Sequence, residues 1–213
     1  MQAPPQSLKP LIVGIGGTTR AGSATEKALR YALRVAENFG ARTEVVAGPD
    51  LAMPLYEPHN PERTPAASRL IDLLRRCQGV IIATPSYHGS VSGLIKNALD
   101  YTEDMRSDEF PYLHSKPVGC IVCAGGPQAI GATLAGLRFI IHALRGWPTP
   151  LGVAVLASGK PAFDDDGGCT DASVTEQMAA MNTQIIKFAQ MRMLARASER
   201  WKDIWPVTPT GHY

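Results

Sequence analysis

The chain has 213 residues, of which 45% are hydrophobic and 19% charged, and its formal net charge is +2. This length suffices for one well-buried α/β domain and is short for two, so we expect a single domain over residues 1–213. The small net charge provides no basic field for nucleic acid. No apolar run approaches the roughly 20 residues that cross a bilayer, and the start of the chain does not resemble a signal peptide. We therefore expect a cytoplasmic protein with no nucleic-acid or membrane partner.

Short apolar runs alternate with segments of helical periodicity along most of the chain. Strands are predicted over residues 11–15, 43–47, 79–83, 117–124 and 151–156, with helices over about 24–39, 66–77, 91–101 and 130–145 between them. Each strand is almost continuously apolar, which is typical of a parallel sheet covered by helices on both faces. A proline-rich loop from residue 48 to about 65 is unusually long, which suggests a cover over a site or a contact with another subunit.

A further helix follows a polar loop at residues 163–171. Its predicted apolar stripe consists of Val174, Met178, Met181, Ile185 and Phe188. The Trp201–Trp205 tail is assigned no secondary structure. Together with this methionine-rich helix it suggests subunit contacts.

Two of the four cysteines, Cys120 and Cys123, have the Cys-x-x-Cys spacing of redox and zinc motifs. They lie in a predicted strand, where side chains three residues apart point to opposite faces. We therefore expect two buried thiols and neither a metal site nor a disulfide. Asp164, Asp165 and Asp166 lack the spacing of a calcium loop and favour a solvated acidic turn.

The loop after the first strand reads Gly14-Ile15-Gly16-Gly17-Thr18-Thr19-Arg20-Ala21-Gly22-Ser23. It fails the dinucleotide fingerprint because position 19 is threonine, and it lacks the lysine of a P-loop. Hydroxyls, backbone N–H groups and a helix N-terminus remain, and together they favour a phosphate dianion. The residues predicted to hold it are Thr18, Thr19, Arg20, Ser23 and Thr25. The alternative is an ordinary helix start capped by Ser23 or Thr25.

The loop after the third strand is crowded with proline, glycine and hydroxyl groups, and a helix follows directly. It reads Pro85-Ser86-Tyr87-His88-Gly89-Ser90. Open α/β sheets bind ligands beyond the carboxyl ends of their strands. The loop therefore predicts a site for a flat, hydrogen-bonding ring, although Tyr87 and His88 could also be plain loop residues.

These loops resemble the NADPH-dependent FMN reductase family over about residues 10–157. The first loop corresponds to the family pattern Gly-Ser-x-Arg-x-x-Ser, although Ala24 stands where many relatives carry asparagine. The family pattern for the second loop and the following helix is Pro-x-Tyr-x-x-Ser-x-x-Gly-x-Leu-Lys-Asn-x-x-Asp. The residues that match it are Pro85, Tyr87, Ser90, Gly93, Lys96, Asn97 and Asp100. His88 stands where relatives often carry asparagine. The glycine-rich turn at Gly125 and Gly126 also has a counterpart in the family.

The resemblance implies a flavodoxin-like three-layer sandwich with a five-stranded parallel sheet in the order 2-1-3-4-5 and helices on both faces. The predicted extra C-terminal helix and the tail, over about 172–213, lie outside the resemblance. By the same resemblance, residues of the first loop bind the FMN phosphate. The other cofactor-binding residues would be Pro85, Ser86, Tyr87, His88, Gly89, Ser90, Gly125 and Gly126. Lys96, Asn97 and Asp100 would organise the helix and a subunit contact.

The implied activity is hydride transfer from NAD(P)H to FMN and then to free flavin, quinone, azo or metal-oxyanion acceptors. Positioning and electrostatics dominate such chemistry, so no protein side chain is expected to act as a catalytic acid or base. Implied partners are a second copy of the chain in a homodimer or homotetramer and a flavin-dependent monooxygenase that receives reduced FMN. The alternative is a flavodoxin-type electron carrier, although such carriers are usually strongly acidic.

Overall fold

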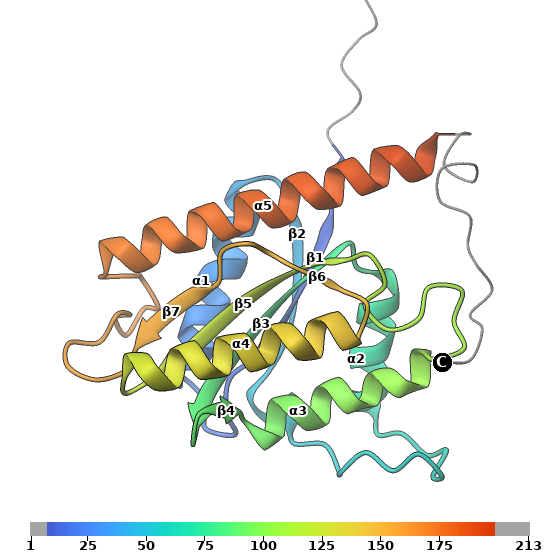
Figure 1. Cartoon of the computed structure of the whole chain (residues 1–213), viewed down its shortest axis with the longest axis horizontal. Coiled ribbons are helices and arrows are strands. Elements are labelled where there is room, and N and C mark those ends of the chain that lie inside the picture. Colours follow the sequence, from blue (N-terminus) through green and yellow to red (C-terminus); the bar gives the residue numbers. More distant parts are fainter. Residues whose placement is uncertain (1–7, 199–213) are drawn as a thin grey trace, which may run out of the picture.

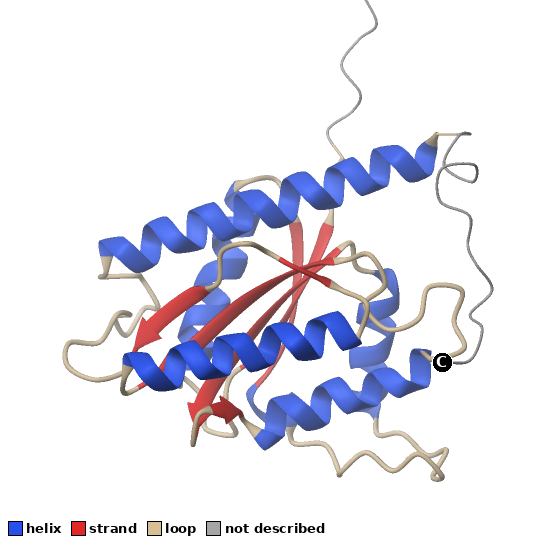
Figure 2. Ribbon diagram, viewed as in Figure 1, coloured by secondary structure: helices blue, strands red, loops and turns tan. Residues whose placement is uncertain are grey.

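The computed structural model describes residues 8–198, whose strands form a central sheet between two layers of helices (Figures 1 and 2). The long helices are α1 (Ala24–Asn38), α2 (Pro65–Arg76), α3 (Gly93–Asp100), α4 (Pro127–Ala143) and α5 (Ala172–Ala197). Two short 3-10 helices, η1 (Gly48–Leu51) and η2 (Tyr101–Met105), extend β2 and α3. The strands are β1 (Leu11–Gly16), β2 (Arg42–Ala47), β3 (Gly79–Tyr87), β4 (Ser90–Val91), β5 (Pro117–Ala124), β6 (Trp147–Pro148) and β7 (Val153–Leu156).

The prediction of a five-stranded sheet in the order 2-1-3-4-5 is wrong, because the sheet has seven strands. Five lie along the path β2-β1-β3-β5-β6, and β4 and β7 pair with β3 and β5 beside this path. The difference comes from the hairpin strand β4 and from the division of the edge strand into β6 and β7. β4 turns back to pair antiparallel with β3. The edge strand beyond β5 is divided into β6 and β7, which pair parallel with the beginning and the end of β5. Pro148, Pro150 and Gly152 lie in or beside this interruption, and prolines cannot donate to a strand ladder.

Alternate residues of the central strands belong to two separate hydrophobic cores. Val80 and Ile82 belong to the core beneath α2, α3 and α4, whereas Ile81 belongs to the core beneath α1 and α5. Cys120 and Cys123 likewise lie in opposite cores, and both are free thiols. Burial raises the pKa of Cys120 to about 12 and that of Cys123 to about 11. The predicted buried pair is therefore confirmed, and its thiols are protonated at neutral pH.

The long α5 lies directly on the sheet beside α1 (Figure 1). A Cβ atom on Gly119 of β5 would lie 2.7 Å from Ile185 and 2.8 Å from Met181, so only glycine permits this approach. Four members of the predicted apolar stripe are buried: Val174, Met178, Met181 and Ile185. Phe188 is half-buried and packs on Trp147 at a ring distance of 5.0 Å. The predicted Trp201–Trp205 tail lies outside the described residues.

Candidate functional site

The three predicted site loops emerge at one edge of the sheet, where the parallel strands end (Figure 2). Gly16 at the end of β1 is in register with Ala83 of β3. Pro85 of β3 is in register with Cys123 of β5. The loops after these three strands are therefore neighbours, as expected for the ligand-binding edge of an open α/β sheet. We call this the carboxyl edge.

Close contact between β1 and β3 determines where the first loop begins. A Cβ atom on Gly16 would lie 2.6 Å from the carbonyl oxygen of Ala83, so a side chain there would push the two strands apart. Gly17 has a φ of 105°, which other residues rarely adopt. The glycines that resembled a nucleotide motif thus permit close backbone packing and a sharp turn.

The first loop is ordered by its own side chains. The Thr18 hydroxyl accepts a hydrogen bond from the Arg20 N–H at 3.2 Å and donates to the Arg20 carbonyl at 3.1 Å. Ser23 is the N-cap of α1, and its hydroxyl accepts from the Glu26 N–H at 3.2 Å. Ser23 is therefore the helix cap that the alternative names, and its role in binding a phosphate stays a prediction. Ser23 is 4% exposed, so a phosphate would contact mainly the loop N–H groups.

Glu26 helps to order this loop, although it is not among the predicted site residues. Its carboxylate accepts from the Gly22 N–H at 3.0 Å and pairs with Arg30 at 2.8 Å. Arg30 offsets the negative charge, which would otherwise repel a phosphate beside it. The Ser23-x-x-Glu26 spacing is that of a capping box and could have indicated this role.

The remaining predicted phosphate ligands differ in their accessibility. Thr19 and Arg20 are exposed. The Arg20 guanidinium has no carboxylate within 4 Å among residues 8–198, so it can pair with an incoming anion. Thr25 is 3% exposed and lies beside the Cys123 thiol beneath the loop. Its side chain therefore supports the loop from below, and its backbone belongs to the first turn of α1.

The second loop is a tight hairpin between β3 and β4. Tyr87 pairs with Ser90, and the two residues between them, His88 and Gly89, have φ values of 54° and 79°. Positive φ at both positions is typical of the turns that close two-residue hairpins. The buried Thr84 hydroxyl accepts from the Ser92 N–H at 3.1 Å and holds the base of the hairpin. Thr84, which directly follows the predicted strand over 79–83, is not among the predicted site residues.

Side chains of the second loop point in different directions. The Ser86 hydroxyl lies 2.6 Å from the Thr133 hydroxyl and also contacts the Ala129 carbonyl, so it ties the loop to α4. The Tyr87 side chain is 57% exposed, which leaves a large aromatic surface open at the carboxyl edge. Pro85 is buried beneath them. An exposed aromatic ring beside backbone polar groups suits a planar, hydrogen-bonding ligand.

The third loop, Gly125 and Gly126, leads into α4. A Cβ atom on either glycine would meet no other group within 4 Å, so there is open space above them. Gly126 is the N-cap of α4 and provides no side-chain hydrogen bond to the helix. The first N–H groups of α4 are therefore available to a ligand.

These observations test whether a phosphate-bearing planar cofactor suits the carboxyl edge. The first loop offers a capped helix start and a free guanidinium, the second an open aromatic surface, and the third open space with uncapped N–H groups. Anions bind favourably at such helix starts. The chemistry of this donor set fits a ligand with a phosphate at one end and a ring at the other.

The proline-rich loop is attached to α3 and η2, beside the second loop. Asn97 is 8% exposed; its amide donates to the Pro54 carbonyl at 2.9 Å and accepts from the Tyr56 N–H at 2.8 Å. Arg63 forms two hydrogen bonds with Asp104, at 2.7 and 2.8 Å, and this pairing lowers the pKa of the carboxyl. Asn97 is thus a scaffold residue, while the exposed Lys96 and Asp100 pair with each other at 2.6 Å.

The acidic turn is attached to α1. Lys27 donates to the Asp164 carbonyl at 2.9 Å, and the Asp164 carboxylate accepts from the Gly168 N–H at 2.6 Å. Asp165 and Asp166 are exposed. This segment therefore connects β7 to α5 along the outside of α1.

Comparison with known proteins gives the family. The family profile described as NADPH-dependent FMN reductase matches residues 10–160. An NADPH azoreductase from Bacillus sp. (strain OY1-2) is 34% identical over 134 residues, which cover 59% of this chain and 69% of that protein. An NAD(P)H-dependent FMN reductase from Pseudomonas aeruginosa is 27% identical over 168 residues, covering 78% and 87% of the two chains.

Among solved structures, the flavoenzyme FerB of Paracoccus denitrificans, an NAD(P)H:(acceptor) oxidoreductase, superposes with a TM-score of 0.67. It is 23% identical, and the match covers 86% of this chain and 98% of that one. The likeness shows the fold, which is flavodoxin-like.

Proposed function

Because the chain belongs to the NADPH-dependent FMN reductase family, it is an oxidoreductase that uses FMN and NAD(P)H, and we propose that it reduces azo compounds or free flavin. The open carboxyl edge carries this proposal. There the exposed Tyr87 and the space above Gly125 and Gly126 leave room for a planar acceptor over a bound ring. The azoreductase and FMN reductase names of the two relatives support the same acceptor classes.

The first loop would hold the phosphate of FMN. Arg20 would pair with it, and the N–H groups around Ser23 and the first turn of α1 would donate to it. Glu26 and Thr25 would keep this loop in position from below, through the Gly22 N–H and through contact with Cys123. The roles of Thr18 and Thr19 would be to shape the loop and to add a hydroxyl donor.

The second and third loops would hold the ring. Pro85, Ser86, Tyr87, His88, Gly89 and Ser90 would line one part of the ring, and Gly125 with Gly126 another. When bound, FMN supplies the capacity to accept a hydride and to pass on electrons. The contribution of the protein would be orientation, and backbone N–H groups would stabilise the negative charge that develops during reduction.

Two measurements test the proposal. The purified protein should bind FMN in a fluorescence titration, and absence of binding would refute the cofactor site. Oxidation of NADPH and NADH is then followed with free FMN, an azo dye and a quinone as acceptors. Turnover with the azo dye or FMN supports the proposal. FMN binding without NAD(P)H oxidation would support the alternative, a flavodoxin-type electron carrier.

A further inference from the structure

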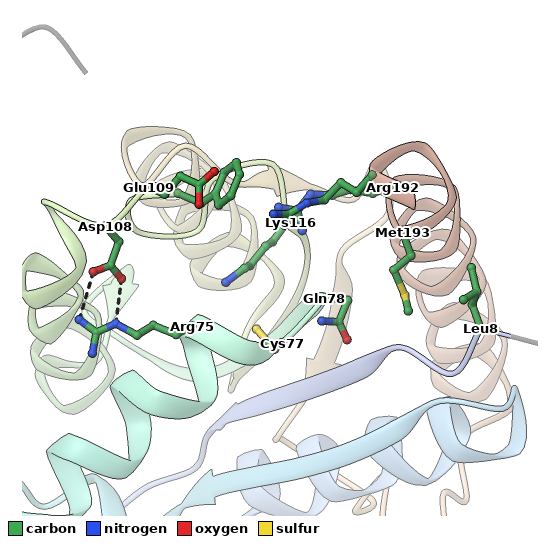
Figure 3. A pocket seen from close by; sticks show the side chains of 11 residues that line it. Leu8, Arg75, Cys77, Gln78, Asp108, Glu109, Lys116, Arg192 and Met193 are labelled. Carbon is green, nitrogen blue, oxygen red and sulfur yellow. Dashed lines mark hydrogen bonds and ion pairs between the residues drawn. The ribbon is translucent and has the colours of Figure 1, made fainter. Parts of the chain in front are cut away.

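A cavity lies at the edge of the sheet opposite the carboxyl edge, where the parallel strands begin (Figure 3). Leu8, Gln78 and Lys116 line it, and they precede β1, β3 and β5. The end of α2, the segment before β5 and the last turns of α5 complete its wall. The cavity has a volume of about 570 Å³, within the range of small-molecule sites. We call it the amino-edge pocket.

Two cations are buried in this pocket, and no carboxylate of residues 8–198 pairs with either of them. Lys116 is 4% exposed and Arg192 is 9% exposed. Lys116 donates to the Leu74 carbonyl, and Arg192 donates to the His114 carbonyl at 3.3 Å. Neither has a carboxylate within 4 Å among residues 8–198, and within that range the Arg192 Nε atom has no hydrogen-bond partner. A carbonyl oxygen accepts a hydrogen bond from one N–H group but carries no net charge, so it does not neutralise the cation. Burial of a charge that is not neutralised costs free energy.

The cations of the pocket also repel one another. Burial lowers the pKa of Lys116, and the nearby charges of Arg192 and Arg196 lower it further. Burial and Arg196 lower the pKa of Arg192 to about 10. The Cys77 thiol in the pocket is no counter-ion, because burial raises its pKa and keeps it protonated.

The carboxylates of the pocket leave this positive charge in excess. Asp108 is engaged by Arg75 through two hydrogen bonds, at 2.8 and 3.2 Å (Figure 3). Glu109 is exposed. Among the described residues, four cations and two carboxylates line the pocket, so this lining has a surplus of two positive charges.

Apolar side chains form another part of the wall. The Arg196 guanidinium lies 4.2 Å from the centre of the Phe110 ring, and Leu8 and Met193 line the pocket as well. Figure 3 shows the Lys116 and Arg192 side chains entering the same pocket from different elements, with the end of Lys116 directed toward the side of Arg75. A ligand that matches this wall has a negative group for the two cations and an apolar body for the remaining surface.

We propose that the amino-edge pocket binds a small organic anion, with Lys116 and Arg192 holding its carboxylate or phosphate group and Phe110 and Met193 contacting its body. This site is separate from the carboxyl edge and does not depend on the proposed acceptor. An anion there supplies the missing counter-charge and a partner for the Arg192 Nε atom. Charge-assisted hydrogen bonds of this kind are the stronger ones.

Isothermal titration calorimetry of the full chain with three probes at constant ionic strength tests this proposal. Benzoate represents a carboxylate on an apolar body, phenyl phosphate represents a phosphate on such a body, and inorganic phosphate has no body. We expect benzoate or phenyl phosphate to bind more tightly than inorganic phosphate. The tighter of the two identifies the anionic group. Failure of both organic probes to bind would overturn the proposal.

Variants then locate the binding. Arg192→Leu and Lys116→Met should each weaken the organic probe by about tenfold, while FMN affinity stays unchanged and reports that the protein is folded. Lys187→Met is the matched control, because it removes an exposed cation from the same helix. If a buried variant fails to fold, Arg196→Gln, at an exposed position, should still weaken binding several-fold. Binding that survives in Arg192→Leu but is lost in Arg20→Ala would place the anion at the carboxyl edge and refute the proposal.

Discussion

The two edges of the sheet offer a negatively charged ligand different kinds of hydrogen-bond donor. The carboxyl edge uses backbone N–H groups, glycines and one exposed guanidinium, and its acidic side chain, Glu26, is paired with Arg30. The amino edge uses buried cationic side chains, Lys116 and Arg192, with little backbone contribution. A site built from backbone N–H groups should therefore be disturbed when a side chain is added at one of its glycines. A site built from charged side chains should lose ligand affinity when one charge is removed.

The largest effect is expected from Gly16→Val, which tests whether the carboxyl edge depends on close backbone packing. Its Cβ atom would lie 2.6 Å from the Ala83 carbonyl oxygen, so overpacking should lower the free energy of unfolding by about 1–3 kcal/mol. Urea unfolding measures this change. Gly131→Ala is the control, because its Cβ atom would meet nothing within 4 Å and position 131 is exposed on α4. Equal stability of Gly16→Val and wild type would contradict the close-packing argument.

Arg20→Ala sharpens the comparison by removing the one unpaired cation of the first loop. We expect FMN binding to weaken by about 1–3 kcal/mol, the value of a hydrogen-bonded charge, while the unfolding free energy stays the same. A fluorescence titration with FMN gives the affinity. Arg42→Ala removes an exposed cation at the start of β2 and should leave the affinity unchanged. If Arg20→Ala binds FMN as wild type does, Arg20 has no role in the site.

A smaller effect on the free energy of unfolding is expected from Lys116→Met at the amino edge, and this effect should depend on pH. Burial lowers the pKa of Lys116 below 10.5, so the unfolded chain binds more protons between the lowered pKa and 10.5. Stability from this group therefore rises with pH across that window in wild type and not in the variant. The unfolding free energy of the variant minus that of wild type should therefore fall as the pH rises from the lowered pKa of Lys116 toward 10.5. Lys187→Met, which removes an exposed lysine from α5, is the control for the loss of a lysine elsewhere in the fold.

The smallest effect is expected from Lys96→Ala, beside the second loop. Lys96 and Asp100 are about half exposed and form a pair one helical turn apart. Such surface pairs contribute about 0.3–0.5 kcal/mol, so urea unfolding should change little and FMN affinity should not change. A clear loss of FMN affinity would instead place Lys96 in the cofactor site and contradict its assignment to the scaffold.

Much of the carboxyl edge could be predicted because its signals are local. Apolar runs followed by glycine and hydroxyl groups identify where parallel strands end, and the start of α1 at Ala24 follows from Ser23 and the helical period after it. Glu26 was missed although its spacing to Ser23 indicated a capping box. The direction of the Ser86 hydroxyl toward Thr133 could not be predicted, because it depends on how α4 packs on β3.

The sequence by itself determined the alternation of strands and helices, the two-sided burial of the sheet, the opposite faces of Cys120 and Cys123, and the chemistry of the three site loops. These follow from periodicity and from residue types that are neighbours in the chain. Only the tertiary structure decided the division of the edge strand into β6 and β7 and the convergence of Lys116 and Arg192 in one pocket. Lys116 and Arg192 are far apart in the sequence and are brought together by packing of α5 on the sheet, which no local pattern encodes.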